Sequence, residues 1–344
     1  MIISLDAMGG DFAPEATVHG AVWAARDFDI EIQLVGRPDV IEAELTKHNT
    51  EGLRLSIVPA SEVIEMGEQP AEAVRAKKDS SIVVALQQVK TGHSQGFVSA
   101  GNSGGILAAA LFGLGRIKGI KRPALSTIFP TMAESGFCFL LDVGANTDVR
   151  PEYLYQFALM GSVYSERVLG IANPKVGLVS TGEEEGKGSR LVKETTQLLK
   201  SGPFNFVGNV EGKDIPAGLA DVVVTDGFTG NVFLKSSEGV ARFILDIIRN
   251  EFESRPMAKA GAFLAQGAFK AIKKKLDWRE FGGGALLGVD GVVIVTHGRS
   301  DAYTIRNAIR EAKKAIENDV INAIKSYQYQ SSVTLKERSV ELPT

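Results

Sequence analysis

Short apolar runs alternate with longer segments of helical spacing along almost the whole chain, and this alternation limits the folds available to it. The first apolar run, at 2–5, precedes a helical segment that Pro14 opens, and the next run follows at 30–35. Short apolar runs are typical of buried strands, and repeated strand–helix units favour a largely parallel sheet with helices on both faces. The pattern therefore predicts an α/β protein with a doubly wound, three-layer α/β/α architecture.

The expected elements cover most of the sequence. We expect strands at 2–5, 30–35, 53–58, 96–99, 124–129, 137–141, 176–179, 206–210, 222–225 and 292–296. We expect helices at about 14–28, 38–48, 80–90, 151–168, 189–200, 229–252 and 301–324, and one that begins near 103.

No repeat and no Pro/Ser-rich linker divides the 344 residues. At about 150 residues per domain, a chain of this length is expected to form two lobes. We therefore expect one continuous two-lobed enzyme over 1–344. One lobe would contain 1–125 and 285–344, and the other would contain 126–284.

One long segment, 229–276, departs from the alternation because it is helical almost throughout, with a break at 254–256. It predicts an inserted hairpin of two long helices. The second arm carries apolar and cationic side chains: Phe263, Leu264, Lys273 and Lys274. This arm can pack on the core or on a second subunit, or it can contact an anionic membrane surface. These possibilities are compatible if paired hairpins expose their tips.

Composition narrows the class of protein further. The formal net charge of −3 makes nucleic acid an unexpected partner. The single cysteine, Cys138, lies in an apolar run and predicts a buried structural thiol in a reducing cytoplasm. Residues 91–115 carry no Asp, Glu, Lys or Arg, but their continuous apolar part is only about ten residues, which is too short to cross a membrane.

Glycine is the residue in excess, because the chain has 37 where the usual share of roughly 7% would give about 24. Many of the glycines follow expected strands, most clearly in the segment 99–105. Glycines there let the backbone approach a ligand, and free N–H groups at a helix start favour an anion. The segment therefore predicts a phosphate site, although a plain helix cap would have the same composition. It also fits the pattern G-x-S-x-G of a serine hydrolase, with Ser103 as the nucleophile and Asp226 and His297 downstream.

Other strand ends carry similar loops. In 180–189, three glutamates separate Gly182 from Gly186, which excludes a P-loop, but Lys187 can still pair with a single anion. Because parallel α/β proteins bind ligands beyond the carboxyl ends of their strands, further polar side chains of these loops are expected to line one cleft: Asp6, Asp11, Asp142, Asn146, Asp226, Asn231 and His297. The histidines show no metal-ligand spacing, so no metal and no cofactor is expected.

Five segments in order, 4–14, 99–105, 182–188, 226–231 and 282–297, resemble the phosphate acyltransferase family PlsX of bacterial phospholipid synthesis. The resemblance covers essentially the whole chain. One departure is that Gly284-Ala285 stands where the family typically has Ala-Pro. Loss of that proline frees a backbone φ angle and reduces the stiffness expected of the loop.

The resemblance implies transfer of a long fatty acyl chain from acyl carrier protein to inorganic phosphate. The acyl phosphate would pass to a membrane glycerol-3-phosphate acyltransferase. The family's fold is similar to isocitrate and isopropylmalate dehydrogenases and to phosphotransacetylases. The resemblance also implies a homodimer in the cytoplasm, associated peripherally with the inner face of the cell membrane.

This chemistry suits the loops, because phosphate is already nucleophilic near neutral pH and a thiolate of pKa about 8.5 leaves readily. We expect direct attack, with phosphate bound by Asn102, Ser103, Gly104 and Gly105. Lys187 and Asn231 would neutralise or orient it, and His297 would move a proton or donate to the oxyanion. The alternatives are a thioesterase that uses Ser103, and a membrane-associated scaffold built on the hairpin.

An acidic carrier protein requires a basic dock. One candidate dock is the short basic segment Arg116, Lys118, Lys121 and Arg122. The lysines of the hairpin form the other. Either could also be an ordinary solvated run of charge.

Overall fold

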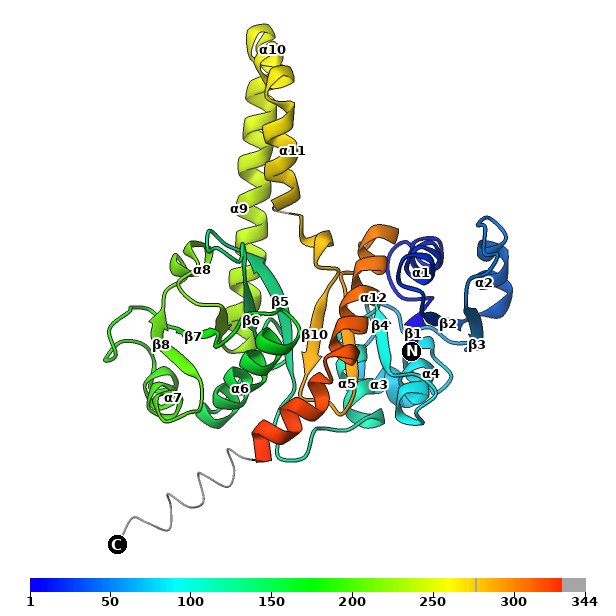
Figure 1. The fold of residues 1–344 in the computed structure, drawn as a ribbon, viewed down its shortest axis with the longest axis horizontal. Helices are drawn as coiled ribbons and strands as arrows, with labels where there is room; N and C mark the ends of the chain where they lie inside the picture. The colour runs from blue at the N-terminus through cyan, green and yellow to red at the C-terminus, as the bar shows by residue number, and fades with distance from the viewer. Residues whose placement is uncertain (276, 330–344) are drawn as a thin grey trace, which may run out of the picture.

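The computed structural model describes residues 1–275 and 277–329. Its strands form one sheet of eleven (Figure 1). In spatial order they are β3 (Leu55–Pro59), β2 (Glu31–Gly36), β1 (Ile2–Asp6), β4 (Gly96–Ser99), β11 (Val292–Val295), β10 (Gly284–Leu287), β5 (Ala124–Pro130), β6 (Phe137–Leu141), β9 (Val222–Val224), β7 (Lys175–Val179) and β8 (Asn205–Val210).

Helices flank this sheet. They are α1 (Glu15–Phe28), α2 (Pro38–Leu45), α3 (Pro70–Ala76), α4 (Ser81–Lys90), α5 (Ser103–Gly113), α6 (Pro151–Arg167), α7 (Arg190–Lys200), α8 (Asp214–Ala217), α9 (Gly227–Ser254), α10 (Pro256–Leu264), α11 (Gln266–Lys275) and α12 (Ala302–Glu317), with a 3₁₀ turn η1 (Trp278–Glu280). A mixed α/β chain with a large central sheet and flanking helices is thus confirmed. The sequence analysis missed β10, α3 and α8.

The sheet consists of two parallel halves that run in opposite directions. Strands β3, β2, β1, β4 and β11 are parallel, and so are β6, β9, β7 and β8. Between them, β10 is antiparallel to both neighbours, and β5 is antiparallel to β6. The sheet is therefore largely parallel, as expected, but its centre is antiparallel, which the sequence patterns did not indicate. The connection from β5 to β6 spans only residues 131–136, which is too short for a parallel crossover.

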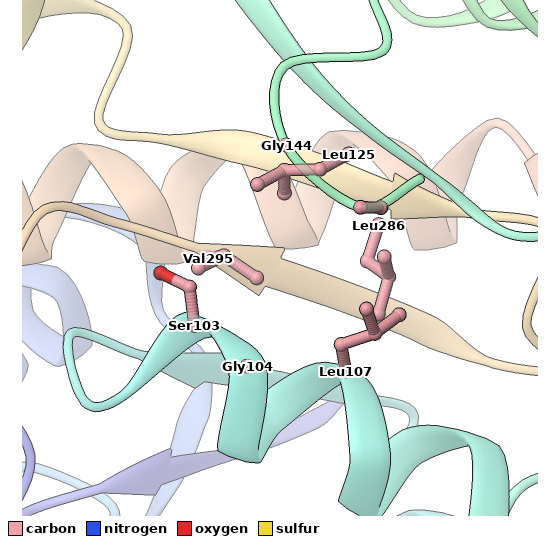
Figure 2. A pocket seen from close by; sticks show the side chains of 8 residues that line it. Ser103, Gly104, Leu107, Leu125, Gly144, Leu286 and Val295 are labelled. Atoms are coloured by element: carbon pink, nitrogen blue, oxygen red, sulfur yellow. The ribbon is translucent and has the colours of Figure 1, made fainter. Parts of the chain in front are cut away.

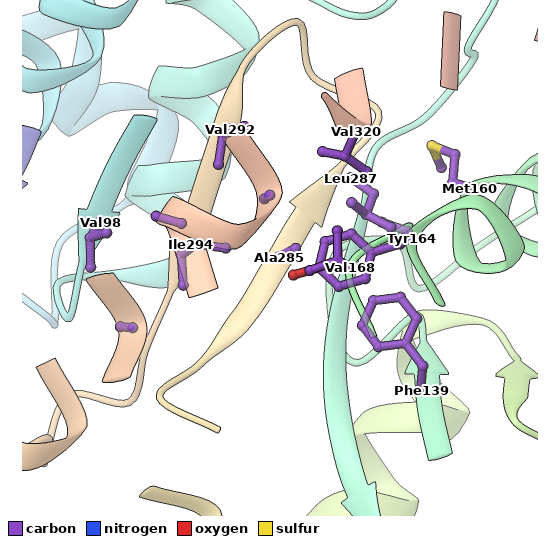
Figure 3. Close-up of a cluster of buried hydrophobic side chains, with 14 of the residues drawn as sticks. Val98, Phe139, Met160, Tyr164, Val168, Ala285, Leu287, Val292, Ile294 and Val320 are labelled. Atoms are coloured by element: carbon purple, nitrogen blue, oxygen red, sulfur yellow. The ribbon is translucent and has the colours of Figure 1, made fainter. Parts of the chain in front are cut away.

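Both faces of the sheet are covered. Successive residues of β4 point to opposite faces, and Phe97 packs in the cluster of α4 and α5 whereas Val98 packs in the cluster of α1, α6 and α12. Figure 3 shows that this second cluster continues across the centre of the sheet, from Val98 to Phe139 and Tyr164. The rings of Phe139 and Tyr164 stack with centroids 4.7 Å apart. One continuous core therefore holds the two halves together.

Cys138 lies on the other face of β6 and is fully buried. Burial raises the pKa of its thiol to about 12. The thiol is thus protonated at neutral pH, as expected of a structural cysteine.

Helix α9 begins on the sheet and continues well beyond it, and α10 and α11 return alongside (Figure 1). Near its start, Phe233 packs on Phe129 with ring centroids 5.1 Å apart. Farther out, the rings of Phe252 and Phe269 meet at 5.5 Å and join the two arms. The projecting part exposes many large apolar side chains, with Leu264 86% exposed. Within 1–275 and 277–329, no helix has the length and apolarity needed to cross a bilayer.

Candidate functional site

The loop 99–105 connects β4 to α5 and presents the start of that helix. Asn102 caps α5, because its side-chain oxygen accepts a hydrogen bond from the Gly105 N–H at 3.0 Å. The N–H groups of Ser103 and Gly104, the first two of the helix, have no intrahelical acceptor. Ser103 is exposed and Gly104 is half-buried. The loop therefore offers two backbone donors and one hydroxyl at the positive end of a helix dipole.

Asn102 also fixes a neighbouring loop. Its amide nitrogen lies 3.1, 3.2 and 3.3 Å from the carbonyl oxygens of Glu65, Met66 and Glu68. The side chain is buried and engaged on both of its polar atoms. The expectation that this side chain contacts phosphate stays a prediction, and the contact that the structure shows is the one that holds the loop 65–68 beside α5.

Asp6, at the end of β1, holds the same loop in place through hydrogen bonds. Its fully buried carboxylate accepts hydrogen bonds from the Ser99 hydroxyl at 2.7 Å and from the Met8 N–H at 3.1 Å. The Ser99 oxygen in turn accepts from the Gly101 N–H at 2.9 Å. Burial raises the pKa of the Asp6 carboxyl, and these hydrogen bonds oppose the rise. Gly9 is required here, because a Cβ would overlap the Asp6 carboxylate.

The loop after β11 lies against the loops after β1 and β4. The Thr296 N–H donates to the Ser99 carbonyl at 2.9 Å, and the Asp11 N–H donates to the Gly298 carbonyl at 2.7 Å. The structure therefore brings Asp6, Asp11, the 99–105 loop and the His297 loop together, as expected for neighbouring parallel strands.

His297 lies at the surface of this group, facing the other half of the molecule. The pKa of its imidazole is lowered by partial burial and by the cations of Arg299 and Lys235. Its ring lies 5.7 Å from that of Trp278. Arg299 also approaches Glu238 of α9 at 4.0 Å, so this loop meets α9 across the two halves. His297 is thus neutral at neutral pH.

Asp142, directly after β6, is enclosed by the backbone of its own loop. One carboxylate oxygen accepts from the N–H groups of Leu125, Gly144 and Ala145 at 3.1, 3.2 and 2.9 Å. The other accepts from the N–H and the side-chain amide of Asn146 at 2.7 and 2.8 Å. Burial raises the pKa of this carboxyl, and the hydrogen bonds oppose the rise. The donors of this loop are therefore occupied by the protein's own carboxylate.

The start of α9 packs on the Asp142 loop. The Gly227 N–H donates to the Asn146 carbonyl at 2.7 Å. Asp226 caps the helix, with its two carboxylate oxygens bound to the N–H and hydroxyl of Thr229 at 2.8 and 2.7 Å. Asn231 is exposed on the first turn. Because Asp226 is engaged with Thr229, it does not orient His297 in the way that the serine hydrolase interpretation requires.

A small pocket of about 50 Å³ lies where α5 faces the Asp142 loop (Figure 2). Its described lining residues are Ser103, Gly104, Leu107, Leu125, Gly144, Ala145, Leu286 and Val295. Figure 2 shows the Ser103 side chain pointing toward Val295, and Leu107 pointing toward Leu286. The pocket is therefore built from both halves of the sheet and from the two central strands between them.

Lys187 is exposed on the loop after β7, and it is not among the described residues that line this pocket. Two of the three glutamates of the loop are paired with lysines, Glu183 with Lys213 at 3.2 Å and Glu185 with Lys200 at 2.5 Å. These pairs neutralise the charges of two glutamates of the loop, and Lys187 adds a positive charge to it.

The candidate docking residues lie in two places. The basic segment after α5 lies at the end of the sheet away from the hairpin tip (Figure 1); Arg116 bonds the Lys121 carbonyl at 2.5 Å, Arg122 lies over the Tyr153 ring, and Lys118 is exposed. Phe263 and Leu264 are exposed on α10. The side chains of Lys273 and Lys274 lie outside what the structure describes.

Sequence reasoning missed the apolar residues of the pocket and the surroundings of His297. The residues missed are Leu107, Leu125, Leu286, Val295, Lys235, Glu238, Trp278 and Arg299. Leucine and valine at these positions have the pattern of ordinary core residues, and the two charges of α9 have the pattern of a solvated helix face. Only the Gly-rich turn before Arg299 gave a signal.

Comparison with known proteins adds sequence and fold relationships. A family model described as "Fatty acid synthesis protein" matches residues 1–323. The chain is 52% identical to "Phosphate acyltransferase" of Heliobacterium modesticaldum over 329 residues, which cover 95% of this chain and 97% of that protein. Among solved structures, a phosphotransacetylase from Streptococcus pyogenes has a TM-score of 0.61 at 19% identity, covering 94% of each chain. A putative 4-hydroxythreonine-4-phosphate dehydrogenase from Salmonella typhimurium has a TM-score of 0.51 at 11% identity, covering 91% of this chain and 98% of that one.

Proposed function

The chain belongs to the fatty acid synthesis protein family and catalyses acyl transfer to phosphate, and from this premise we propose that phosphate binds at the start of α5 and attacks the acyl donor directly. The observation that supports this site is the pair of free N–H groups at Ser103 and Gly104, facing a pocket built from both halves of the sheet. The same residues lie at the positive end of the helix dipole, where a phosphate dianion is stabilised.

Direct transfer needs alignment more than acid–base catalysis. A phosphate oxygen attacks the thioester carbonyl carbon, the C–O bond forms, and the C–S bond breaks with release of thiolate. The reaction requires phosphate held in line with the carbonyl and donors for the developing oxyanion. Neither a thiol nor a hydroxyl nucleophile is needed, which agrees with the inert thiol of Cys138.

The remaining site residues have supporting roles in this proposal. Neutral His297 donates a hydrogen bond to the oxyanion or moves a proton between phosphate and thiolate, since its pKa is lowered. Asn231, exposed at the start of α9, orients the phosphate from the other half. Lys187, exposed on the loop after β7, supplies a cation for the phosphate.

The reaction path is tested with ¹⁸O-labelled phosphate and an acyl carrier thioester. Labelled acyl phosphate, with no covalent adduct on Ser103, is the expected result. Free fatty acid together with an adduct on Ser103 would instead support the thioesterase. Turnover by purified protein without membranes would exclude a scaffold as the sole role.

Acyl carrier protein is the proposed donor, and the basic segment after α5 is its proposed dock. This segment is close to the pocket, because the Asn146 side chain donates to the Pro123 carbonyl at 2.7 Å and Leu125 lines the pocket. Reversing the charge of Arg116 and Arg122 should weaken carrier binding steeply at low salt, since the attraction is electrostatic. Binding measured by titration at low and high salt checks this, and unchanged affinity of the double variant would dismiss the segment as the dock.

The two lobes that we propose, 1–125 with 285–344 and 126–284, agree with the reversal of strand direction at β10 and β5. We propose in addition that the family's dehydrogenase-like α/β/α core carries α9–α11 as an inserted hairpin. The apolar side chains exposed on this hairpin need a partner. A second subunit would cover part of the hairpin and leave the tip for the membrane surface.

Membrane contact by the tip is tested with a paired substitution. Phe263→Asp with Leu264→Asp should abolish liposome binding, because both side chains are exposed apolar groups (69% and 86%) and charge prevents their entry into the interface. Turnover of a soluble acyl donor should be unchanged. Liposome binding by the double variant at the original strength would refute the membrane contact. It would also remove the support for our proposal that acyl phosphate is delivered to a membrane glycerol-3-phosphate acyltransferase at the inner face of the cell membrane.

A further inference from the structure

The pocket beside α5 is polar at one end only. Ser103 is the one described lining residue with a polar side chain, and it lies at the helix start together with the free N–H groups. Along the same helix, Leu107 lies one turn farther in, about 6 Å from Ser103. Leu107 faces Leu286 of β10, as Figure 2 shows. The pocket thus changes from polar to apolar along the axis of α5.

The opposite wall is apolar for a separate reason. Gly144 and Ala145 line it, and a loop of this composition would ordinarily expose backbone donors. Both N–H groups instead donate to Asp142, at 3.2 and 2.9 Å. The wall therefore offers a ligand Cα and Cβ atoms and no free N–H. This makes the inner part of the pocket unsuited to phosphate.

We propose that this inner part is the subsite for the first methylene groups of the fatty acyl chain, with the thioester carbonyl beside the phosphate that binds at the start of α5. The inference rests on the proposed function. The ligand must carry a polar, reactive group at one end and an apolar chain at the other, and the pocket has the same polarity over the same length. The pocket's volume of about 50 Å³ is well below that of a typical small-molecule pocket, so the subsite takes only the first methylene groups of a long chain and the remainder extends beyond it.

The subsite lets individual residues determine which acyl chain lengths the enzyme prefers. Each methylene removed from water improves binding by about fourfold. A two-carbon acyl group ends at its methyl group, before Leu107, whereas a twelve-carbon group passes it. Leu107 is therefore the specificity-determining residue that separates the two substrates.

The test compares phosphate-dependent kcat/KM for two-carbon and twelve-carbon acyl thioesters in the full-length protein. Leu107→Phe narrows the pocket and should lower the twelve-carbon value at least tenfold while the two-carbon value stays within twofold. Leu107→Ala removes contacts without adding bulk and should lower the twelve-carbon value several-fold, again sparing the two-carbon value. Phe112→Ala, at an exposed position of α5 outside the described lining, is the control and should leave the ratio unchanged.

A ratio that does not move in either Leu107 variant would overturn the subsite, and so would equal losses for both substrates. The two-carbon substrate also reports folding, so a misfolded Leu107→Phe is recognised and Leu107→Ala then decides. Failure of the proposed function has a different signature, because the wild-type protein would then form no acyl phosphate from either substrate.

Discussion

Two glycine-rich loops of this protein have similar sequences and opposite chemistry. Ser99-Ala100-Gly101-Asn102-Ser103-Gly104 and Asp142-Val143-Gly144-Ala145-Asn146 both follow a central strand, and both line the same pocket. In the first, the N–H groups of Ser103 and Gly104 are free to bind a ligand. In the second, the N–H groups of Gly144, Ala145 and Asn146 all bind Asp142.

The difference comes from where the nearest carboxylate is located. Asp142 is the first residue of its own loop, so the chain folds around it. The first loop has no acid of its own, and its support comes from Asp6 on β1, which binds the Ser99 hydroxyl on the inner side. A loop supported from the neighbouring strand keeps its outward donors available. A glycine-rich loop is therefore an anion site only if its donors are not already used within the fold.

The largest effect is expected from removing donors of the open loop. Ser103→Pro deletes the N–H together with the hydroxyl, and proline is well tolerated at the first position of a helix. Asn102 already lies outside the helical region, with φ −59° and ψ 109°, and proline disfavours mainly the helical conformation in the residue before it. We expect kcat/KM for phosphate to fall by about 10²–10³, because the N–H and hydroxyl donors to a charged ligand are both lost.

Ser103→Ala is the matched control for that variant, because it removes the hydroxyl and keeps the N–H. We expect kcat/KM for phosphate to fall by only about tenfold, because one of the two donors to the charged phosphate is lost. Steady-state kinetics at saturating acyl donor measures both variants. Equal loss in the two would mean that the hydroxyl carries the function, as in a serine hydrolase.

A smaller effect, on stability instead of catalysis, is expected from the closed loop. Asp142→Ala leaves several partly buried N–H groups without an acceptor, so the free energy of unfolding should fall by about 2–3 kcal/mol. Chemical denaturation at neutral pH measures this change. If Asp142→Ala kept its stability and instead lost phosphate affinity as strongly as Ser103→Pro, the distinction between the two loops would collapse.

The smallest effect is expected in the pH dependence of kcat/KM, through the protonation of His297. Its pKa lies below 6.5 because of partial burial, Arg299 and Lys235. The imidazole therefore stays neutral above that folded-state value, and the acid limb of kcat/KM should lie below pH 6.5. Arg299→Gln removes one of the cations and should move the limb upward.

The lowered pKa of His297 also determines how this group makes stability depend on pH. The unfolded chain binds a proton on His297 more readily than the native one does, so the contribution of this group to stability rises with pH between the folded and unfolded pKa values and is complete above the latter. An acid limb that stays in place in Arg299→Gln would remove His297 from the catalytic account.

The sequence predicted the strands well where apolar runs were long and separated by helices. It failed at the centre, where β10 begins with Gly284 and Ala285 and its pairing depends on partners far away in the chain. Residue types also placed phosphate chemistry at Ser103 and Gly104, because glycine and a helix start act locally. The engagement of Asn102 with the loop 65–68 and of Asp226 with Thr229 depends on tertiary contacts and geometry that no local pattern encodes.

The most direct test is residue-resolved amide hydrogen exchange, followed by NMR with and without inorganic phosphate. The account predicts fast exchange at Ser103 and Gly104 in the free protein and strong protection of both when phosphate is bound. The amides of Gly144, Ala145 and Asn146 should exchange slowly in both states, because they are already bonded to Asp142. Phosphate binding that protects the Asp142 loop and leaves Ser103 and Gly104 exchanging freely would contradict it.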